Sequence, residues 1–310
     1  MSDPKKILVT LDGSKRSKRT VDYLCSFKPF RDREVTLFNI TTPVPEAYYD
    51  LTRDSFSNIS ESQIKAWEMG QKTIITEFLK EARQKMIAAG YKPGNIGIKL
   101  ISRAKGVARG VLDEIKNNEY HSLVIRRKGR DNSILGVAMG GVAAKLVEKA
   151  DFIPLVIAGT REIRHHQCVA VDGSPGAKRA VRYTADMMAK TNCRIILCAI
   201  MRTTVKESVP QGQDPFADLA LWAQGKLNDA LVEAKLILTQ AGISEDRIET
   251  RLVQGAQSRA GALLDIARAA ECDTIVMGRR GMSDVESFDM GRIPRKIIYA
   301  SRKFTIWLIP

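Results

Sequence analysis

The chain has 310 residues, the length of about two ordinary domains, and its 44% hydrophobic and 6% aromatic content is typical of a globular protein. No apolar stretch approaches the roughly 20 residues of a membrane helix, and the charged first residues differ from a signal segment, so we expect a soluble, cytoplasmic protein. The net charge of +14 favours anionic partners, and the first half of the chain carries the larger share of it.

In the first half, short β-branched runs alternate with longer segments whose apolar residues recur every three or four positions. This pattern is typical of a parallel sheet covered by helices. Strands are predicted at residues 7–11, 35–41, 96–101, 122–125 and 154–157, and residues 42–60 are predicted as a long loop. The apolar face of the helix after that loop comprises Trp67, Ile74, Ile75, Phe78, Leu79 and Ala82.

The second half alternates in the same way, with strands predicted at residues 168–171, 194–201, 248–253, 274–277 and 305–309. Two helices with apolar faces follow the first two of these strands. One face comprises Ala177, Ala180, Val181, Ala185 and Met188, and the other Phe216, Leu219, Ala220, Ala223, Leu227, Ala230, Leu231 and Ala234.

An internal repeat explains why the two halves look alike. Val9-Thr-Leu-Asp-Gly-Ser14 reappears as Val169-Ala-Val-Asp-Gly-Ser174, and Ser122-Leu-Val-Ile-Arg-Arg-Lys-Gly129 as Thr274-Ile-Val-Met-Gly-Arg-Arg-Gly281. The repeat predicts one α/β domain at residues 1–158, a linker at 159–166 and a second α/β domain at 167–310.

Polar and glycine residues follow the first and fourth strands of each copy, where open parallel sheets bind ligands. Asp12-Gly13-Ser14 and Asp172-Gly173-Ser174 follow the first strands. Asp-Gly-Ser is equally a good turn and helix N-cap, so the motif alone leaves both interpretations open. After the fourth strand of the second copy, Gly278, Gly281 and Gly291 have the spacing Gly-x2-Gly-x9-Gly, and glycines let a backbone approach phosphate oxygens closely.

These motifs resemble the universal stress protein family, whose nucleotide-binding members carry Gly-x2-Gly-x9-Gly followed by Ser or Thr and an Asp after the first strand. The resemblance covers almost the whole chain, once in each half. It implies a Rossmann-like sheet of strand order 3-2-1-4-5 in each copy, a role in the stress response, and binding of ATP with Mg²⁺. In the second copy it implies a nucleotide site made of Val171, Asp172, Met277, Gly278, Arg280, Gly281, Gly291, Arg292 and Ile293.

Two departures from the family pattern affect this expectation. Arg292 stands where the family has Ser or Thr, and it could block a phosphate or pair with it. In the first copy Arg126 replaces the first glycine and Gly141 replaces the Ser or Thr, so a basic cleft that binds another anion is expected there instead. Its residues are Asp12, Lys15, Arg126, Arg127, Lys128, Gly129, Gly140 and Gly141, with Arg16, Lys18 and Arg19 nearby; a solvated charge cluster is the alternative.

Other classes of function find less support in the sequence. The histidines are His121, His165 and His166, which provide neither a metal-binding cluster nor an obvious general base, so no metal site and at most slow ATP hydrolysis are expected. The five cysteines contain no Cys-x-x-Cys pair and are expected to be small buried residues. No aromatic platform for nucleic acid is present. A signalling or interaction module that binds no nucleotide stays open as the alternative.

The fifth strands, Ile153–Ile157 and Phe304–Ile309, are apolar edges that should pair with each other. The family commonly dimerises through this strand, so the resemblance implies a pseudo-dimer within the chain. It also implies a homodimer of the whole protein.

Overall fold

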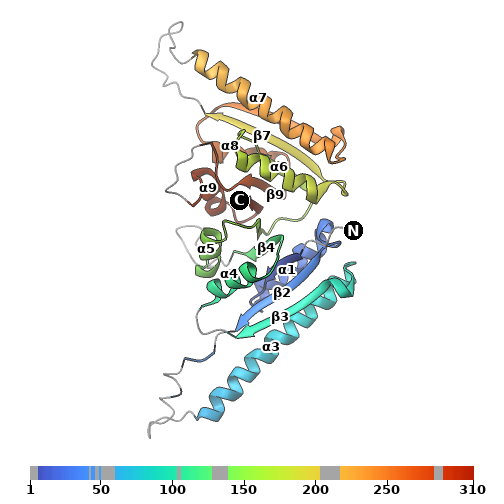
Figure 1. The fold of residues 1–310 in the computed structure, drawn as a ribbon, viewed down its shortest axis with the longest axis vertical. Coiled ribbons are helices and arrows are strands. Elements are labelled where there is room, and N and C mark those ends of the chain that lie inside the picture. Colours follow the sequence, from blue (N-terminus) through green and yellow to red (C-terminus); the bar gives the residue numbers. More distant parts are fainter. Residues whose placement is uncertain are drawn as a thin grey trace. The chain divides into compact units, whose positions relative to one another are not determined.

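The computed structural model describes residues 6–41, 43–45, 49, 60–102, 106–127, 139–202, 217–282 and 289–310. These residues form two compact units (Figure 1). Unit 1 holds the described residues up to 127 together with Gly140–Ala150, and unit 2 holds Met139 and Asp151–Pro310.

Unit 1 contains four parallel strands in the order β3-β2-β1-β4. The strands are β1 (Lys6–Thr10), β2 (Glu34–Thr41), β3 (Ile96–Ser102) and β4 (Ser122–Arg126). The helices are α1 (Lys15–Ser26), α3 (Glu61–Ala88), α4 (Val107–Asn117) and α5 (Gly141–Lys149), with short 3₁₀ turns at Lys28–Phe30 and Pro93–Asn95.

Unit 2 contains six strands in the order β5-β10-β9-β6-β7-β8. They are β5 (Leu155–Ala158), β6 (His166–Ala170), β7 (Arg194–Arg202), β8 (Ile248–Ala256), β9 (Thr274–Gly278) and β10 (Thr305–Ile309). The helices are α6 (Pro175–Met188), α7 (Ala217–Gln240), α8 (Arg259–Ala269) and α9 (Arg292–Ala300), with a 3₁₀ turn at Glu245–Arg247.

The central strands are buried on both faces, which is why they read as continuous apolar runs rather than as alternating ones. Ile7, Leu8 and Val9 of β1 are fully buried, and so are Ile275 and Val276 of β9. Helices cover the sheets: α3 packs on β2 and β3 in unit 1, and α7 packs on α6, β7 and β8 in unit 2. Each core therefore has the layered arrangement of an α/β domain.

The predicted fold class is confirmed, and each predicted strand is present with its ends shifted by at most three residues. The predicted count of five parallel strands in each sheet needs correction. β5 belongs to unit 2, where it runs antiparallel to β10 with Ile157 opposite Ile306 and Leu155 opposite Leu308. The expected pairing of the two fifth strands is thus confirmed, and its reason is that two fully apolar strands bury each other's edges.

The apolar faces predicted for the two long helices are correct only in their second halves. No described residue before Phe78 in α3, or before Ala230 in α7, is buried. Trp67, Ile74 and Leu219, which were predicted on these faces, are exposed, whereas Phe216 lies outside the described residues. The reason is visible in Figure 1, where the first turns of α3 and α7 reach beyond the strands that they cover.

None of the helices that the structure describes is long and apolar enough to cross a membrane.

Candidate functional site

A large cleft lies at the carboxyl ends of the strands in unit 1, and we call it the unit 1 cleft. Its volume is about 1680 Å³. The ends of β1, β2, β3 and β4 form its floor, while α3 supplies one wall with Lys65, Trp67 and Ile75. It therefore lies at the edge of the sheet that the strand-end argument predicts.

Asp12, at the end of β1, is committed to local structure. Its Oδ1 accepts hydrogen bonds from the backbone N–H of Ser14 (3.0 Å) and from the hydroxyls of Ser14 (2.6 Å) and Ser17 (2.5 Å). The Ser14 hydroxyl in turn accepts from the Ser17 N–H and caps α1. The Asp-Gly-Ser motif is thus a turn and N-cap here, and it holds the first helix at the rim of the cleft.

Two helices point their N-termini into the unit 1 cleft, and neither end is capped by a side chain. α4 begins after Gly106, which has a φ of 83°, and α5 begins after Gly140. Neither helix has an acidic residue in its first turn. The unpaired N–H groups and the positive ends of the helix dipoles make both termini suited to anions.

Arginine side chains from two segments meet at the same cleft. Arg16 of α1 and Arg126 and Arg127 at the end of β4 line it. Partial burial lowers the pKa of Arg126, and the neighbouring positive charges of Arg19 and Arg16 lower it further, which places these three guanidinium groups near one another. An anion between them would relieve that repulsion.

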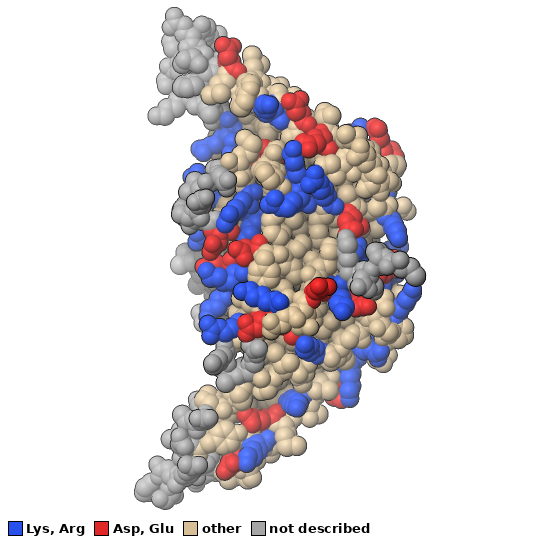
Figure 2. All heavy atoms as spheres, viewed as in Figure 1, with Lys and Arg blue, Asp and Glu red and all other residues tan. Residues whose placement is uncertain are grey.

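The remaining residues of the predicted basic cleft have different positions. Gly140 and Gly141 line the cleft, Lys15 is not among its lining residues, and Lys128 and Gly129 lie outside the described residues. Positive charge is not uniform over the surface: Figure 2 shows Lys and Arg interspersed with Asp and Glu on the face it presents. The sequence analysis missed Gly106 and the α3 wall; a glycine just before the helix that follows β3 was the available signal for the former.

In unit 2 the structure brings the predicted nucleotide residues together. A Cβ added to Gly281 would stand 2.8 Å from the Asp172 Oδ2 atom, and one added to Gly278 would stand 2.6 Å from the backbone of Gly176. Both positions require glycine because side chain or backbone atoms of the first turn of α6 come so close. The loop after β9 is therefore packed directly on the start of α6.

Arg279 ties this loop together, which the sequence did not reveal. Its backbone N–H donates to Ile309 O (2.6 Å), its Nε donates to Asp289 O (2.9 Å), and its carbonyl accepts from the Gly291 N–H (2.9 Å). Arg279 is buried although its neighbour Arg280 is exposed. Nothing in the two consecutive arginines distinguishes the structural one from the exposed one.

The helix that follows the loop begins at Arg292, directly after Gly291, and has no side-chain cap. A positive side chain in the first turn opposes the helix dipole. Space is scarce on the adenosine side, since the cavity that touches Val171 and Gly173 measures about 10 Å³, roughly the room for one water molecule. The two copies thus differ: unit 1 has the room, and unit 2 has the closely packed glycines.

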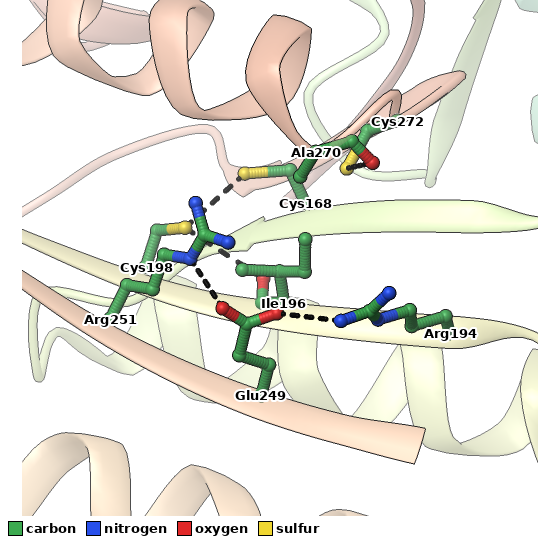
Figure 3. A network of polar contacts seen from close by, with 8 residues as sticks. All are labelled: Cys168, Arg194, Ile196, Cys198, Glu249, Arg251, Ala270 and Cys272. Atoms are coloured by element: carbon green, nitrogen blue, oxygen red, sulfur yellow. Dashed lines mark hydrogen bonds and ion pairs between the residues drawn. The ribbon is translucent and has the colours of Figure 1, made fainter.

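A cluster of thiols lies between β6 and β7 of unit 2 (Figure 3). The Sγ atoms of Cys168 and Cys198 are 3.4 Å apart, and hydrogen bonding to Cys198 and Cys272, together with burial, raises the pKa of the Cys168 thiol. All cysteines are free thiols, and four of the five are buried. In the described part of the chain, no group of His, Cys, Asp and Glu could hold a metal ion.

Two tandem units with a largely parallel sheet, covering helices, and helix N-termini gathered at the carboxyl ends of the strands define a Rossmann-like α/β protein with one candidate ligand site per unit. A model of the universal stress protein family matches residues 4–158 and again residues 164–303. The chain therefore belongs to the universal stress protein family and carries two tandem copies of its domain.

Solved structures share this fold over the full length of the chain. A universal stress protein from Archaeoglobus fulgidus DSM 4304 is 18% identical, with a TM-score of 0.65 over 98% of this chain and 97% of its own. A putative universal stress protein from Pseudomonas aeruginosa UCBPP-PA14 is 11% identical, with a TM-score of 0.59 over 99% of this chain and 93% of its own. At these identities the likeness shows the fold alone.

Proposed function

We propose that this tandem universal stress protein is a cytoplasmic stress-response regulator that binds a phosphate-bearing ligand in the unit 1 cleft. The observation that carries the proposal is the meeting of two uncapped helix N-termini with Arg16 and Arg126 in one cleft of about 1680 Å³. Helix N-termini and guanidinium groups both favour phosphate oxygens.

The position of Arg126 favours an anion other than simple ATP. The side chain is partly buried and lines the cleft where the family pattern has a glycine, so it occupies space that a phosphate cradled by backbone would need. Recognition in unit 1 is then by arginine side chains, with the termini of α4 and α5 supplying N–H donors.

Calorimetric titration at low salt tests this, with inorganic phosphate, pyrophosphate, ATP and cyclic AMP as probes. Replacing Arg16 and Arg126 together by Gln should weaken binding of the preferred probe by tenfold or more, because each charge-assisted hydrogen bond contributes about 1.5–3 kcal/mol. Arg182→Gln, at an exposed position in the middle of α6, removes a positive charge far along that helix and is the matched control. Equal binding by the double variant and the control would refute the proposal.

A second candidate function is binding of ATP with Mg²⁺ in unit 2. It is favoured by the contact of Gly281 with Asp172 and by the uncapped start of α9 at Arg292. Val171 and Asp172 would contact the adenosine, and the loop from Met277 to Gly291, with Arg292 and Ile293, would surround the phosphates. Beyond slow hydrolysis we propose no catalysis. Protection of the chain against heat by ATP, tested with and without Mg²⁺, would support this site if Gly281→Val abolishes it.

A further inference from the structure

The exposed face of α7 carries a regular seam that the fold of unit 2 does not use. Its residues are separated alternately by four and three positions, the spacing of a coiled-coil heptad, and all are exposed. They are Asp218, Trp222, Gly225, Asp229, Val232 and Leu236. A separate face of the same helix, with Ala230, Leu231, Ala234 and Leu238, is buried on unit 2.

Apolar side chains of this seam are unusually open to solvent. Trp222 is 60% exposed, Val232 69% and Leu236 53%. Single exposed apolar residues are common on protein surfaces, but three on one helix stripe form a patch of the kind that marks an interaction site.

Gly225 points in the same direction. Glycine inside a helix costs about 1 kcal/mol relative to alanine. A Cβ added at Gly225 would meet no atom within 4 Å, so nothing in the chain itself requires glycine there. Close approach of another backbone at this point of the seam is a physical reason for it.

We propose that two copies of this chain associate through α7, with the two helices antiparallel and centred near residue 227. In that register Trp222 faces Val232 of the partner subunit, Gly225 faces Asp229 of the partner subunit, and Asp218 faces Leu236 of the partner subunit. The seam is thus complementary to itself, as a twofold interface must be. The glycine leaves room for the partner's Asp229 beside Lys226, which holds its ammonium group 5.8 Å from the Trp222 ring centroid.

Other arrangements place like charges together. A parallel pair would set Asp229 against Asp229 of the partner subunit in the middle of the seam, and moving the antiparallel centre toward Trp222 would set Asp218 against the partner's Asp229. The equivalent helix of unit 1 begins similarly, with Trp67, Gly70 and Ile74, but its seam continues with the exposed carboxylates Glu77 and Glu81. The apolar seam of α7 is the longer one, so the proposal concerns α7.

The overlap from Asp218 to Leu236 is about 27 Å long at the helical rise of 1.5 Å per residue. Fewer than three heptads give a short contact, and we expect a dimer that dissociates on dilution rather than an obligate one. The proposal does not depend on the ligand sites.

Sedimentation velocity of the full chain over a range of concentrations tests the association. The unaltered protein should form a reversible dimer, and Trp222→Ala or Val232→Glu should raise the dissociation constant of the dimer at least about tenfold, as loss of a central aromatic or apolar contact does. Trp67→Ala, the matched change in α3, should leave it unaltered. A chain that is monomeric throughout, or variants that dimerise like the unaltered protein, would overturn the proposal, provided that circular dichroism shows each variant folded.

Cross-linking tests the orientation. Gly225→Cys and Asp229→Cys are made in separate copies that also carry Cys25→Ser, because Cys25 is the cysteine that is not buried. A short bismaleimide should link the mixture of the two copies far more than either copy alone. Efficient linking of each copy to itself would show a parallel pair, and equal background in all samples would show that the seam is not the interface; either result would overturn the proposal.

Discussion

Gly281 lies directly against Asp172, so closely that a Cβ on the glycine would stand 2.8 Å from the Asp172 Oδ2 atom. The other carboxylate oxygen of Asp172 accepts the Ser174 N–H (3.0 Å), which holds the start of α6. The loop after β9 and the turn after β6 are therefore joined at one point. That point is the center of the proposed nucleotide site in unit 2.

We predict that Gly281→Val abolishes ATP binding while the chain still unfolds cooperatively. The branched side chain would push the loop away from Asp172, and the backbone could no longer approach a phosphate. Titration calorimetry measures the binding and chemical denaturation the folding. Gly129→Val, in the incomplete motif of the first half, is the control and should leave ATP binding intact. Survival of binding in Gly281→Val together with its loss in Gly129→Val would place the ATP site in the other unit.

Arg292→Ser restores the residue that the family has at this position, and we predict two opposite effects. The folded protein without ligand should gain about 0.3–1 kcal/mol, because a positive charge leaves the N-terminus of α9. Binding of ATP should weaken by about 1.5–3 kcal/mol, because the arginine pairs with phosphate. Denaturation with and without ATP measures both quantities. Tighter binding by the variant would mean that the arginine obstructs the site.

The stability of unit 2 should depend strongly on Asp273. This buried carboxylate accepts hydrogen bonds from the backbone N–H groups of Arg164 (2.7 Å) and His166 (3.2 Å) and from the Thr274 hydroxyl (2.6 Å). Asp273→Ala leaves these donors without an acceptor and should lower the free energy of unfolding by about 1–3 kcal/mol.

The control for this prediction is Asp265→Ala, which removes an exposed ion pair with Arg268. Its effect should stay below about 0.5 kcal/mol, since exposed pairs contribute little. Similar losses in the two variants, measured by urea denaturation, would contradict the role assigned to Asp273.

The repeat was sufficient to predict the fold but not the shape of either site. Residues such as Ile7, Val169 and Ile275 are buried on both faces of a sheet, so the apolar runs that contain them predict strands directly. The glycine spacing likewise identified Gly278 and Gly281, which the structure packs closely.

Space and side-chain direction depend on packing between distant segments, which leaves no local pattern. Arg279 and Arg280 are adjacent and chemically identical, yet only Arg279 is buried, because its partners come from β10 and from Asp289. The unit 1 cleft depends on where α3 lies over the strand ends, and periodicity in α3 does not reveal that Trp67 lies beyond the sheet.

Acid should weaken the ion pairs of Glu249, which are drawn in Figure 3. The Arg251 Nε donates to Glu249 Oε1 (2.5 Å) and Arg194 lies 3.1 Å from Oε2. The hydrogen bond from Arg251 holds the pKa of Glu249 below its usual value, although partial burial acts in the opposite direction. A lowered pKa in the folded state means that this stabilisation is present above the usual pKa of glutamate and is lost as the pH falls through the folded value.

We therefore predict that Glu249→Gln lowers the free energy of unfolding by about 0.5–1 kcal/mol at pH 7, and that the variant and the unaltered protein converge near pH 3. Urea denaturation as a function of pH measures this. A difference that is independent of pH would show that the glutamate acts by shape and not by charge.

The most direct test of the unit 1 proposal is to identify the small molecules that copurify with the chain, by mass spectrometry of the denatured protein. We predict that a phosphate-bearing ligand is released from the unaltered protein, is lost when Arg16 and Arg126 are both replaced by Gln, and is retained in Gly281→Val. The arginines and the helix N-termini of the unit 1 cleft provide the reason. A ligand that persists in the arginine variant but disappears in Gly281→Val would contradict the assignment and place the ligand in unit 2.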